Sequence, residues 1–221
     1  MPRQRTSSTF RRLTRIPYRR NYRQRSARTI LSQGGVPGGA TRISPKVPVA
    51  AEVKFKDTVV GYSSLGGAWN LVQANMLQGI TQGTGASQRI GRSIKIVGIT
   101  YRVEVAQTGA QVYPYSMDFG FDKQSNSALP VVTDIYSGTS PVQLPNPIFD
   151  RRYKFLKRME TKDAQQLATL MTGVIKVNQV VNFSGTLGTI ADMEDFNLFM
   201  TFASTVTTSL QGIIRVNYVD A

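Results

Sequence analysis

The sequence predicts an all-β domain that follows a basic N-terminal segment. From residue 52 onward, short runs rich in Val, Ile, Tyr, Phe and Thr alternate with clusters of Gly, Pro, Asn, Asp and Ser. This pattern of residues is typical of strands and the turns that join them. About eight such runs occur, and several are separated by long connections. The pattern favours a single jelly roll, an eight-stranded antiparallel sandwich, over an immunoglobulin-like sandwich, whose turns are shorter and more even.

The first expected strand lies in the run 52–57, EVKFKD, where apolar and charged residues alternate. Successive side chains of a strand point to opposite faces, so we expect Val53 and Phe55 to face the core. Lys54 and Lys56 are then expected to face solvent.

A longer strand is expected over residues 93–105, SIKIVGITYRVEV. Its apolar positions change phase near Gly98, and a β-bulge there would keep both halves facing the core in one curved strand. Further strands are expected at Tyr115–Asp122, Tyr153–Glu160, Val174–Phe183, Asn197–Ser204 and Gly212–Val219, with a short one between Phe183 and Asn197.

Helical signals are few, and none is expected to form a layer. Asp163–Leu170 and Ala68–Leu77 are each long enough for about two turns. The segment 82–91, QGTGASQRIG, has neither the Gly-Lys-Ser/Thr ending nor the strand-to-helix setting of a phosphate-binding loop. We interpret it as a turn between two strands.

Positive charge is concentrated at one end of the chain. Residues 1–51 contain 12 Lys and Arg and no acidic residue, whereas the rest of the chain contains 15 basic and 13 acidic residues. This segregation indicates a segment that binds an extended polyanion such as nucleic acid. We expect residues 1–33 to be an Arg-rich arm that is disordered until bound, residues 34–50 a Gly/Pro hinge and residues 51–221 the jelly-roll domain.

The arm combines two kinds of side chain suited to nucleic acid. Guanidinium groups bind phosphates bidentately and stack on bases, and aromatic rings stack on unpaired bases. No base-reading motif accompanies them, so we expect binding without sequence preference. The candidate residues are Arg3, Arg5, Arg11, Arg12, Arg15, Arg19, Arg20, Arg23, Arg25, Arg28, Tyr18 and Tyr22. A mitochondrial presequence is the alternative, although Pro17 interrupts any amphipathic helix there.

Several function classes are excluded by composition. The chain contains no Cys and no His, which removes disulfides, thiolate nucleophiles, zinc sites of the usual ligand types and imidazole-based triads. We therefore expect no catalytic site, no cofactor and no metal. No run of 18 or more apolar residues occurs, so we expect neither membrane insertion nor secretion through a signal peptide.

Charged residues outside the arm are candidates for contacts between subunits. The basic ones flank the glycine-rich turn and open the run RRYKFLKR at 151–158. The acidic ones lie in ADMED at 191–195 and are candidates for pairing with that basic run, for a divalent cation between subunits, or for a solvated loop. These candidates are Arg89, Arg92, Arg151, Arg152, Asp192, Glu194 and Asp195. Apolar residues of Pro141–Phe149, PVQLPNPIF, are also expected to be exposed for contacts.

The order of several segments carries a resemblance to a known family. The segments are QGTGASQRIGRSIKI (82–96) leading into ITYRVEV, RRYKFLKRMETKD (151–163), VIKVNQVVNFSG (174–185), NLFMTFAS (197–204) and GIIRVNYVDA (212–221). With the Arg-rich arm before them, they resemble the capsid proteins of circular single-stranded DNA viruses of the circovirus-like, Rep-encoding kind. Related jelly-roll coats occur in satellite and positive-strand RNA viruses.

The resemblance implies a structural protein of the virion. It implies a partner that is the chain itself, with about 60 copies in the smallest icosahedral shell, and arms turned inward onto a packaged single-stranded, circular DNA genome. It also implies passage through the host nucleus, with the RRLTRIPYRR run available to a nuclear import receptor. The alternative is a ribosomal or other RNA-scaffolding protein, which would keep a basic tail but remain monomeric without RNA.

Overall fold

The computed structural model describes residues 52–108, 113–161 and 167–221. Its strands are β1 (Lys54–Leu65), β2 (Trp69–Gln73), β3 (Ser93–Gln107), β4 (Tyr115–Asp122), β5 (Tyr153–Thr161), β6 (Ala168–Asn182), β7 (Asn197–Ser204) and β8 (Thr208–Asp220). The predicted arm (1–33) and hinge (34–50) lie outside the described residues. In the described part, no helix is long and apolar enough to cross a membrane.

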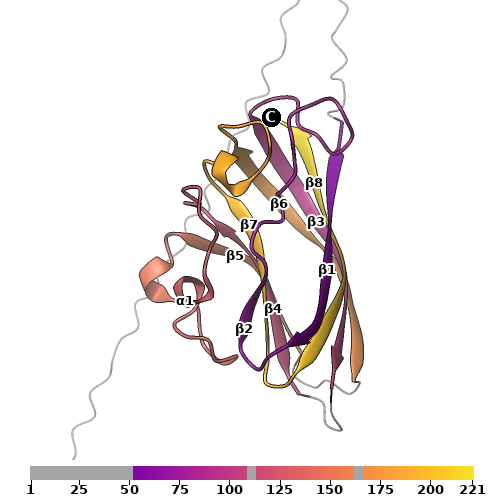
Figure 1. Cartoon of the computed structure of the whole chain (residues 1–221), viewed down its shortest axis with the longest axis vertical. Helices are drawn as coiled ribbons and strands as arrows, with labels where there is room; N and C mark the ends of the chain where they lie inside the picture. Colours follow the sequence, from indigo (N-terminus) through magenta and orange to yellow (C-terminus); the bar gives the residue numbers. More distant parts are fainter. Residues whose placement is uncertain (1–51, 109–112, 162–166) are drawn as a thin grey trace, which may run out of the picture. The chain divides into compact units, whose positions relative to one another are not determined.

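Within these residues, eight strands form two four-stranded sheets that face each other (Figure 1). Their orders are β1-β8-β3-β6 and β2-β7-β4-β5, and every neighbouring pair is antiparallel. Every strand except β5, whose single neighbour is β4, therefore lies beside a strand that does not adjoin it in sequence, as in a jelly roll with its two Greek keys. The all-β, single jelly-roll fold predicted from the sequence is confirmed.

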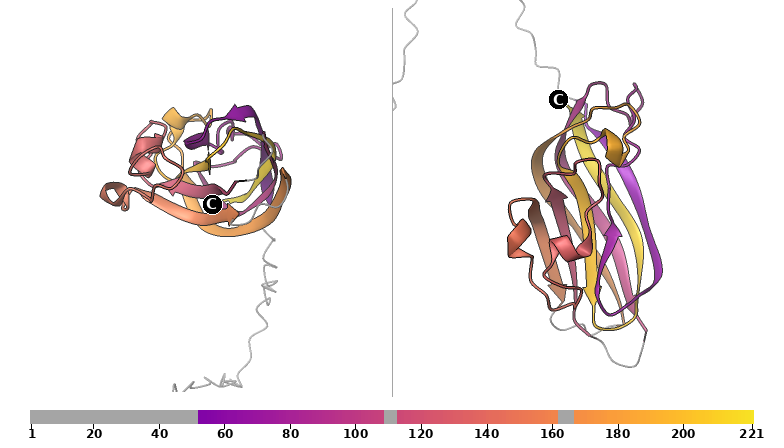
Figure 2. Two further views of the ribbon diagram at one scale, coloured as in Figure 1. Left: turned by 90° about the horizontal axis from the view of Figure 1, so that it is seen from below. Right: turned by 60° about the vertical axis from the view of Figure 1, so that its left-hand side comes forward.

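The core fills the space between the two sheets, which Figure 2 shows from one end. Strand β3 buries every second residue over most of its length, including Ile94, Ile96, Tyr101 and Val103. These side chains meet inward residues of the facing sheet such as Phe119, and Tyr101 lies 5.5 Å from it between ring centroids. The alternation of apolar and polar residues in β3 thus places one face in the core and the other in solvent.

Strand β1 has the opposite phase from the one predicted. Lys54 is buried at 2% exposure, while Val53 and Phe55 are exposed at 59% and 39%. The Lys54 ammonium forms an ion pair with Asp220 at 2.8 Å and donates to the Gln88 carbonyl at 2.8 Å. Because these partners compensate the buried charge, the lysine occupies an inward position that alternation alone assigns to Phe55.

The predicted irregularity at Gly98 is confirmed. The register of β3 shifts between Ile96 and Gly98 against both of its neighbours, β6 and β8. Ile96 and Ile99 are both fully buried although they are three residues apart. The bulge therefore lets the two halves of this 15-residue strand face the same core.

Two other regions differ from the prediction. The helix expected over Ala68–Leu77 is wrong, because Trp69–Gln73 is the edge strand β2 paired with β7. The three-residue spacing of Trp69 and Val72 suits one helix face, but in a strand it places them on opposite faces, and both faces of this sheet are buried.

At the C-terminal end of the predicted helix 163–170, residues 168–170 already belong to β6, and residues 163–166 lie outside the described part. The short strand expected between Phe183 and Asn197 is wrong too. That segment has a single bridge between Phe183 and Met193 and a 3-10 turn, η2 (Ile190–Asp192).

Candidate subunit-contact surface

The connection between β4 and β5 lies against the outer face of the β2-β7-β4-β5 sheet (Figures 1 and 2). We call residues 123–152 the covering loop. It contains the helical turn α1 (Val132–Ile135) and the 3-10 turn η1 (Pro147–Phe149). Ile135 of α1 is buried against the sheet. The covering loop thus gives this sheet a second apolar layer on its outer side.

This second layer explains the composition of the strands beneath it. All eight residues of β7 are buried, so its run NLFMTFAS shows no alternation between apolar and polar faces. Inward residues such as Phe202 join the main core, while Phe199 and Ala203 pack outward under the covering loop. A strand that is buried on both faces has a nearly continuous run of apolar residues in its sequence.

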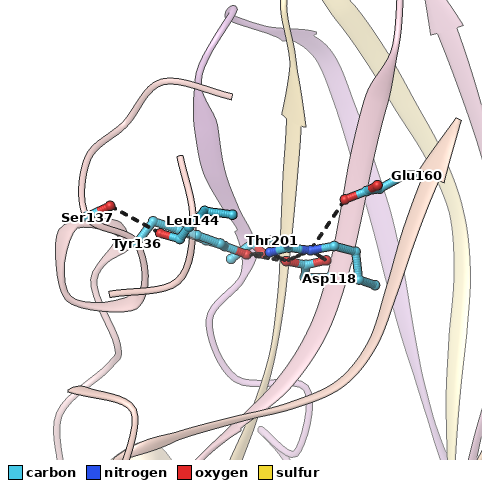
Figure 3. Close-up of polar contacts among 7 residues, drawn as sticks. Asp118, Tyr136, Ser137, Leu144, Glu160 and Thr201 are labelled. Atoms are coloured by element: carbon cyan, nitrogen blue, oxygen red, sulfur yellow. Dashed lines mark hydrogen bonds and ion pairs between the residues drawn. The ribbon is translucent and has the colours of Figure 1, made fainter. Parts of the chain in front are cut away.

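Four polar side chains join the covering loop to the sheet, and we call them the Asp118 network (Figure 3). The Tyr136 hydroxyl donates to the Asp118 carboxylate at 2.7 Å and lies 2.7 Å from the Thr201 hydroxyl. From β5, the Arg158 guanidinium donates to both carboxylate oxygens of Asp118, at 2.6 to 3.1 Å. Asp118 and Tyr136 are fully buried.

The charges of the network are compensated inside the protein. Burial raises the pKa of Tyr136, and the Asp118 charge raises it further, so the phenol stays a neutral donor. The hydrogen bonds to Asp118 raise the pKa of Arg158. Removing one member of such a buried set leaves a remaining polar group with a hydrogen bond or charge that is no longer matched, which costs more than the hydrogen bond itself contributes.

Trp69 fixes the ring of Tyr136 from the edge of the sheet. The two rings are stacked, with centroids 3.9 Å apart and planes 11° apart. The Arg158 guanidinium lies 5.7 Å from the Trp69 ring centroid, and the Trp69 backbone N–H donates to the Thr139 carbonyl at 2.6 Å. Strand β2, β5 and the covering loop therefore meet at one place.

A second ion pair fastens the two ends of the covering loop. Arg152, just before β5, donates to both oxygens of Asp122, the last residue of β4, at 2.9 and 2.7 Å. Its other nitrogen lies 3.7 Å from Asp134 of α1. The hydrogen bonds to the fully buried Asp122 raise the pKa of Arg152. The loop ends are thus held together independently of the Asp118 network.

The covering loop has its own hydrogen bonds, which determine what it exposes. The Ser137 backbone N–H donates to the Leu144 carbonyl at 3.2 Å, and the Asn146 side chain accepts from the Ile148 N–H at 3.1 Å. This folding leaves Val142, Leu144 and Ile148 outside, with exposures of 78%, 69% and 80%. The predicted exposure of apolar residues in Pro141–Phe149 is confirmed, and its use in subunit contacts remains a prediction.

A pocket of 440 Å³ opens beside Val142 and Leu144. One wall is the segment 141–144 of the covering loop, and the other contains Arg158, Glu160 and Trp69. An exposed apolar rim next to a pocket with paired charges is the kind of surface that protein partners bind. We take this rim and pocket as the candidate subunit-contact surface.

The basic residues predicted for subunit contacts fall into two groups. Arg92 and Arg151 are exposed. Arg152 pairs with Asp122 inside its own subunit, as described above. The prediction for Arg89 needs correction, because its side chain is fully buried and donates to the carbonyls of Gly91 and Gly185. Its guanidinium also lies 4.4 Å from the centroid of the Phe183 ring.

Within one chain, the acidic residues of 191–195 have separate surroundings. In the described ranges, no group of three or more acidic residues is placed to hold a metal ion. The Asp192 carboxylate accepts from the N–H groups of Thr189 and Leu187, and these hydrogen bonds, chiefly that from Thr189, lower its pKa. Asp195 accepts from the backbone and side chain of Asn182. Glu194 is exposed.

Sequence reasoning missed the Asp118 network altogether. Asp118 and Asp122 alternate with apolar residues in YSMDFGFD, which is also the pattern of a strand with one solvated face. Their partners Arg158 and Arg152 lie 40 and 30 residues away. The sequence feature that could have indicated it is the long connection between the two strands. This connection contains many apolar residues, which predicts that it packs against the sheet.

Comparisons with known proteins identify no family for this chain. No family model matches it, and no curated protein does. Among solved structures, a chain of the native virion of Kashmir bee virus at acidic pH has a TM-score of 0.36 and 12% identity, covering 99% of this chain and 91% of that one. A chain of Desmodium yellow mottle tymovirus has a TM-score of 0.29 and 12% identity, covering 81% and 94%. A chain of the full particle of Israeli acute paralysis virus, heated to 63 degrees, has a TM-score of 0.33 and 10% identity, covering 99% and 88%.

Proposed function

We propose that this chain is a viral capsid protein that assembles with itself into a closed shell and packages a single-stranded genome. The observation that carries the proposal is the segregation of charge. Residues 1–51 contain 12 basic and no acidic side chains, and a jelly roll with nearly balanced charge follows them. A balanced body can pack against copies of itself, while the basic segment neutralises phosphates.

The covering loop supports the self-assembly part of the proposal. The Asp118 network and the Arg152–Asp122 pair hold the loop in one conformation. The exposed side chains of Val142, Leu144 and Ile148 are thus preorganised, which reduces the entropy lost when a partner binds. In a closed symmetric shell, the same surface is used by every copy.

The finer assignments rest on the resemblance noted in the sequence. They are a circular DNA genome, a shell of about 60 copies in the smallest icosahedral arrangement, and localisation in the virion and, during infection, the host nucleus through an import receptor. The proposal includes no enzymatic activity, no cofactor and no metal. Membrane insertion is not part of it.

The packaging role is tested on the full chain by changing the charge of the arm. In one variant the ten arginines from Arg3 to Arg28 become glutamine, and in the matched control they become lysine. Binding of a fluorescent single-stranded oligonucleotide is measured by anisotropy over a range of salt concentrations, with DNA and RNA of the same length compared.

Wild type and the lysine control should both bind with a steep salt dependence, with an upper bound near −8 for the slope of log K against log salt if all 12 cations contact phosphates. The glutamine variant should lose most of that slope. If the glutamine variant binds as tightly as the lysine control at every salt concentration, the arm does not package nucleic acid. A body that stays monomeric under all conditions would instead fit the RNA-scaffolding alternative.

A further inference from the structure

The outer face of the β1-β8-β3-β6 sheet is uncovered by any described segment. In Figures 1 and 2 the covering loop lies on the other sheet, and no described element lies beyond β1, β8, β3 and β6 on their outer side. This face exposes apolar side chains, among them Val59, Ile213, Leu170 and Val174, at 51% to 72%. Four large apolar residues exposed on one uncovered sheet face indicate a contact surface.

The strand register arranges this face into a ridge beside a groove. Val59 of β1 lies opposite Ile213 of β8, which lies opposite Arg102 of β3. We call these three residues the ridge row. Two residues further along each strand, the side chains point to the same face again. The row of residues at that position projects less from the sheet than the ridge row does.

This lower row consists of Gly61, Gln211 and Glu104, which lie opposite one another in the same three strands. We call it the groove row. Gly61 has no side chain, and a Cβ atom built on it would meet nothing within 4 Å. A groove of 880 Å³ is lined by both rows and by Leu170 of β6.

The two rows carry one unpaired charge each. Arg102 and Glu104 are both exposed, and neither has an ion-pair partner among the residues that the structure describes. On the same face, Arg215 donates to both oxygens of Asp57 at 2.7 Å. The ridge and groove rows therefore offer one positive and one negative side chain about 7 Å apart along β3.

A single symmetry operation satisfies both the shape and the charge. Consider a two-fold axis that runs across the strands, parallel to the sheet, above Val103. It reverses the strand direction, so Arg102 of one copy faces Glu104 of the other, and the reverse pair forms as well. The same axis places Val59 over Gly61 and Ile213 over Gln211. Each ridge thus enters the other groove, as an isologous interface requires.

We propose that a second copy of this chain binds the outer face of the β1-β8-β3-β6 sheet through this two-fold contact. The contact rests on the proposed self-assembly and names one of its interfaces. The occupant follows from the charge pattern of the ridge and groove rows, because Arg102 beside Glu104 gives these two rows no net charge to attract nucleic acid, whereas a second copy in the two-fold arrangement complements both charges.

The experiment uses two full-length single variants, Arg102→Glu and Glu104→Arg, and their double variant. Each single variant places like charges opposite each other at both ion pairs. Freed of nucleic acid, each should associate at least about a hundredfold more weakly than wild type in sedimentation equilibrium. An equimolar mixture of the two single variants should dimerise like wild type, and the double variant should do so by itself.

A second pair of variants tests the groove. Gly61→Leu fills it without a clash inside the subunit and should abolish dimerisation while the far-ultraviolet circular dichroism stays that of wild type. Gly66→Leu is the matched control, because Gly66 is equally open but lies in the β1–β2 turn. It should dimerise like wild type.

Wild-type protein that shows no dimer, single variants that dimerise normally, or a mixture that fails to recover would each overturn this contact. These outcomes are separable from the packaging role. If the nucleic-acid test above succeeds and the mixture fails to dimerise, the capsid proposal stands and this interface falls. If the mixture dimerises and the arm variants show no effect on binding, the interface stands and the packaging role falls.

Discussion

The hydroxyl of Tyr136 donates a 2.7 Å hydrogen bond to the carboxylate of Asp118, and both groups are fully buried. This bond connects the covering loop to β4 in the sheet beneath it. Because Thr201 of β7 hydrogen-bonds to Tyr136 and Arg158 of β5 donates to Asp118, three strands and the loop share one polar centre. The surface that the loop exposes is therefore coupled to the stability of the sandwich.

Replacing Tyr136 by phenylalanine tests this coupling. Tyr136→Phe keeps the ring that stacks on Trp69 but removes both hydrogen bonds, and it should lower the free energy of unfolding by about 1 to 2 kcal/mol. Tyr218→Phe is the matched control. Its hydroxyl is also buried, has no hydrogen-bond partner among the described residues and has a pKa raised by burial to about 12. Urea denaturation should leave this control unchanged or slightly more stable; equal losses in both variants would contradict the role of the network.

Arg158→Met should be more damaging, because it leaves the fully buried Asp118 carboxylate without its cation. We expect a loss of about 3 kcal/mol or more in the free energy of unfolding. Adding Asp118→Asn removes the uncompensated charge and should recover part of that loss. A double-mutant cycle measures the recovery, and purely additive losses would show that the two side chains are not energetically coupled.

The Lys54–Asp220 pair predicts a dependence of stability on acid. Burial opposes ionisation of Asp220, but the hydrogen bonds from Lys54 and the Ile90 N–H outweigh it, so the pKa of Asp220 is lowered in the folded protein. Its stabilisation is present above the unfolded pKa of about 4 and is lost as the pH falls through the lower, folded value.

Asp220→Asn should therefore destabilise the protein by about 2 kcal/mol or more at neutral pH, because Lys54 stays buried. The difference from wild type should shrink below about pH 4. Asp57→Asn breaks the exposed pair with Arg215 and should cost at most about 1 kcal/mol. Thermal unfolding across pH checks both, and a difference that persists at the lowest pH would contradict the assignment to Asp220.

The exposed residues of the covering loop should matter for assembly and not for folding. Ile148→Ser removes an apolar side chain that is 80% exposed, so the free energy of unfolding should change by less than about 0.5 kcal/mol. The concentration needed for particles to form, measured by light scattering, should rise. Leu187→Ser, exposed at 65% in the segment before η2, is the matched control and should assemble normally.

Features that depend on neighbouring residues were predicted correctly from the sequence, and features that depend on residues distant in sequence were not. The strands at Tyr115–Asp122 and Asn197–Ser204 have the predicted bounds because apolar runs rich in aromatic residues end there at turn residues. The predicted orientation of the side chains in β1 was wrong because the buried Lys54 pairs with Asp220. That residue lies at the other end of the domain in sequence. Strand β2 was missed because its outer face is buried by a loop that begins about 50 residues later.

The site shows the same division. The exposure of Pro141–Phe149 was predictable, since three prolines interrupt this apolar segment and keep it out of the strands. The Asp118 network was not, because the outward position of Asp118 becomes a buried one only when the covering loop packs on the sheet. Long-range packing decides whether a charged residue on a strand is a solvated group or part of a buried network.

Sedimentation velocity of the full-length recombinant protein, with detection at both 260 and 280 nm, distinguishes a self-assembled shell around nucleic acid from a monomer. A shell gives a sharp boundary far heavier than the 24.4 kDa chain that absorbs strongly at 260 nm. A slow species of monomer size, which merely aggregates when nucleic acid is added, would contradict the proposed shell.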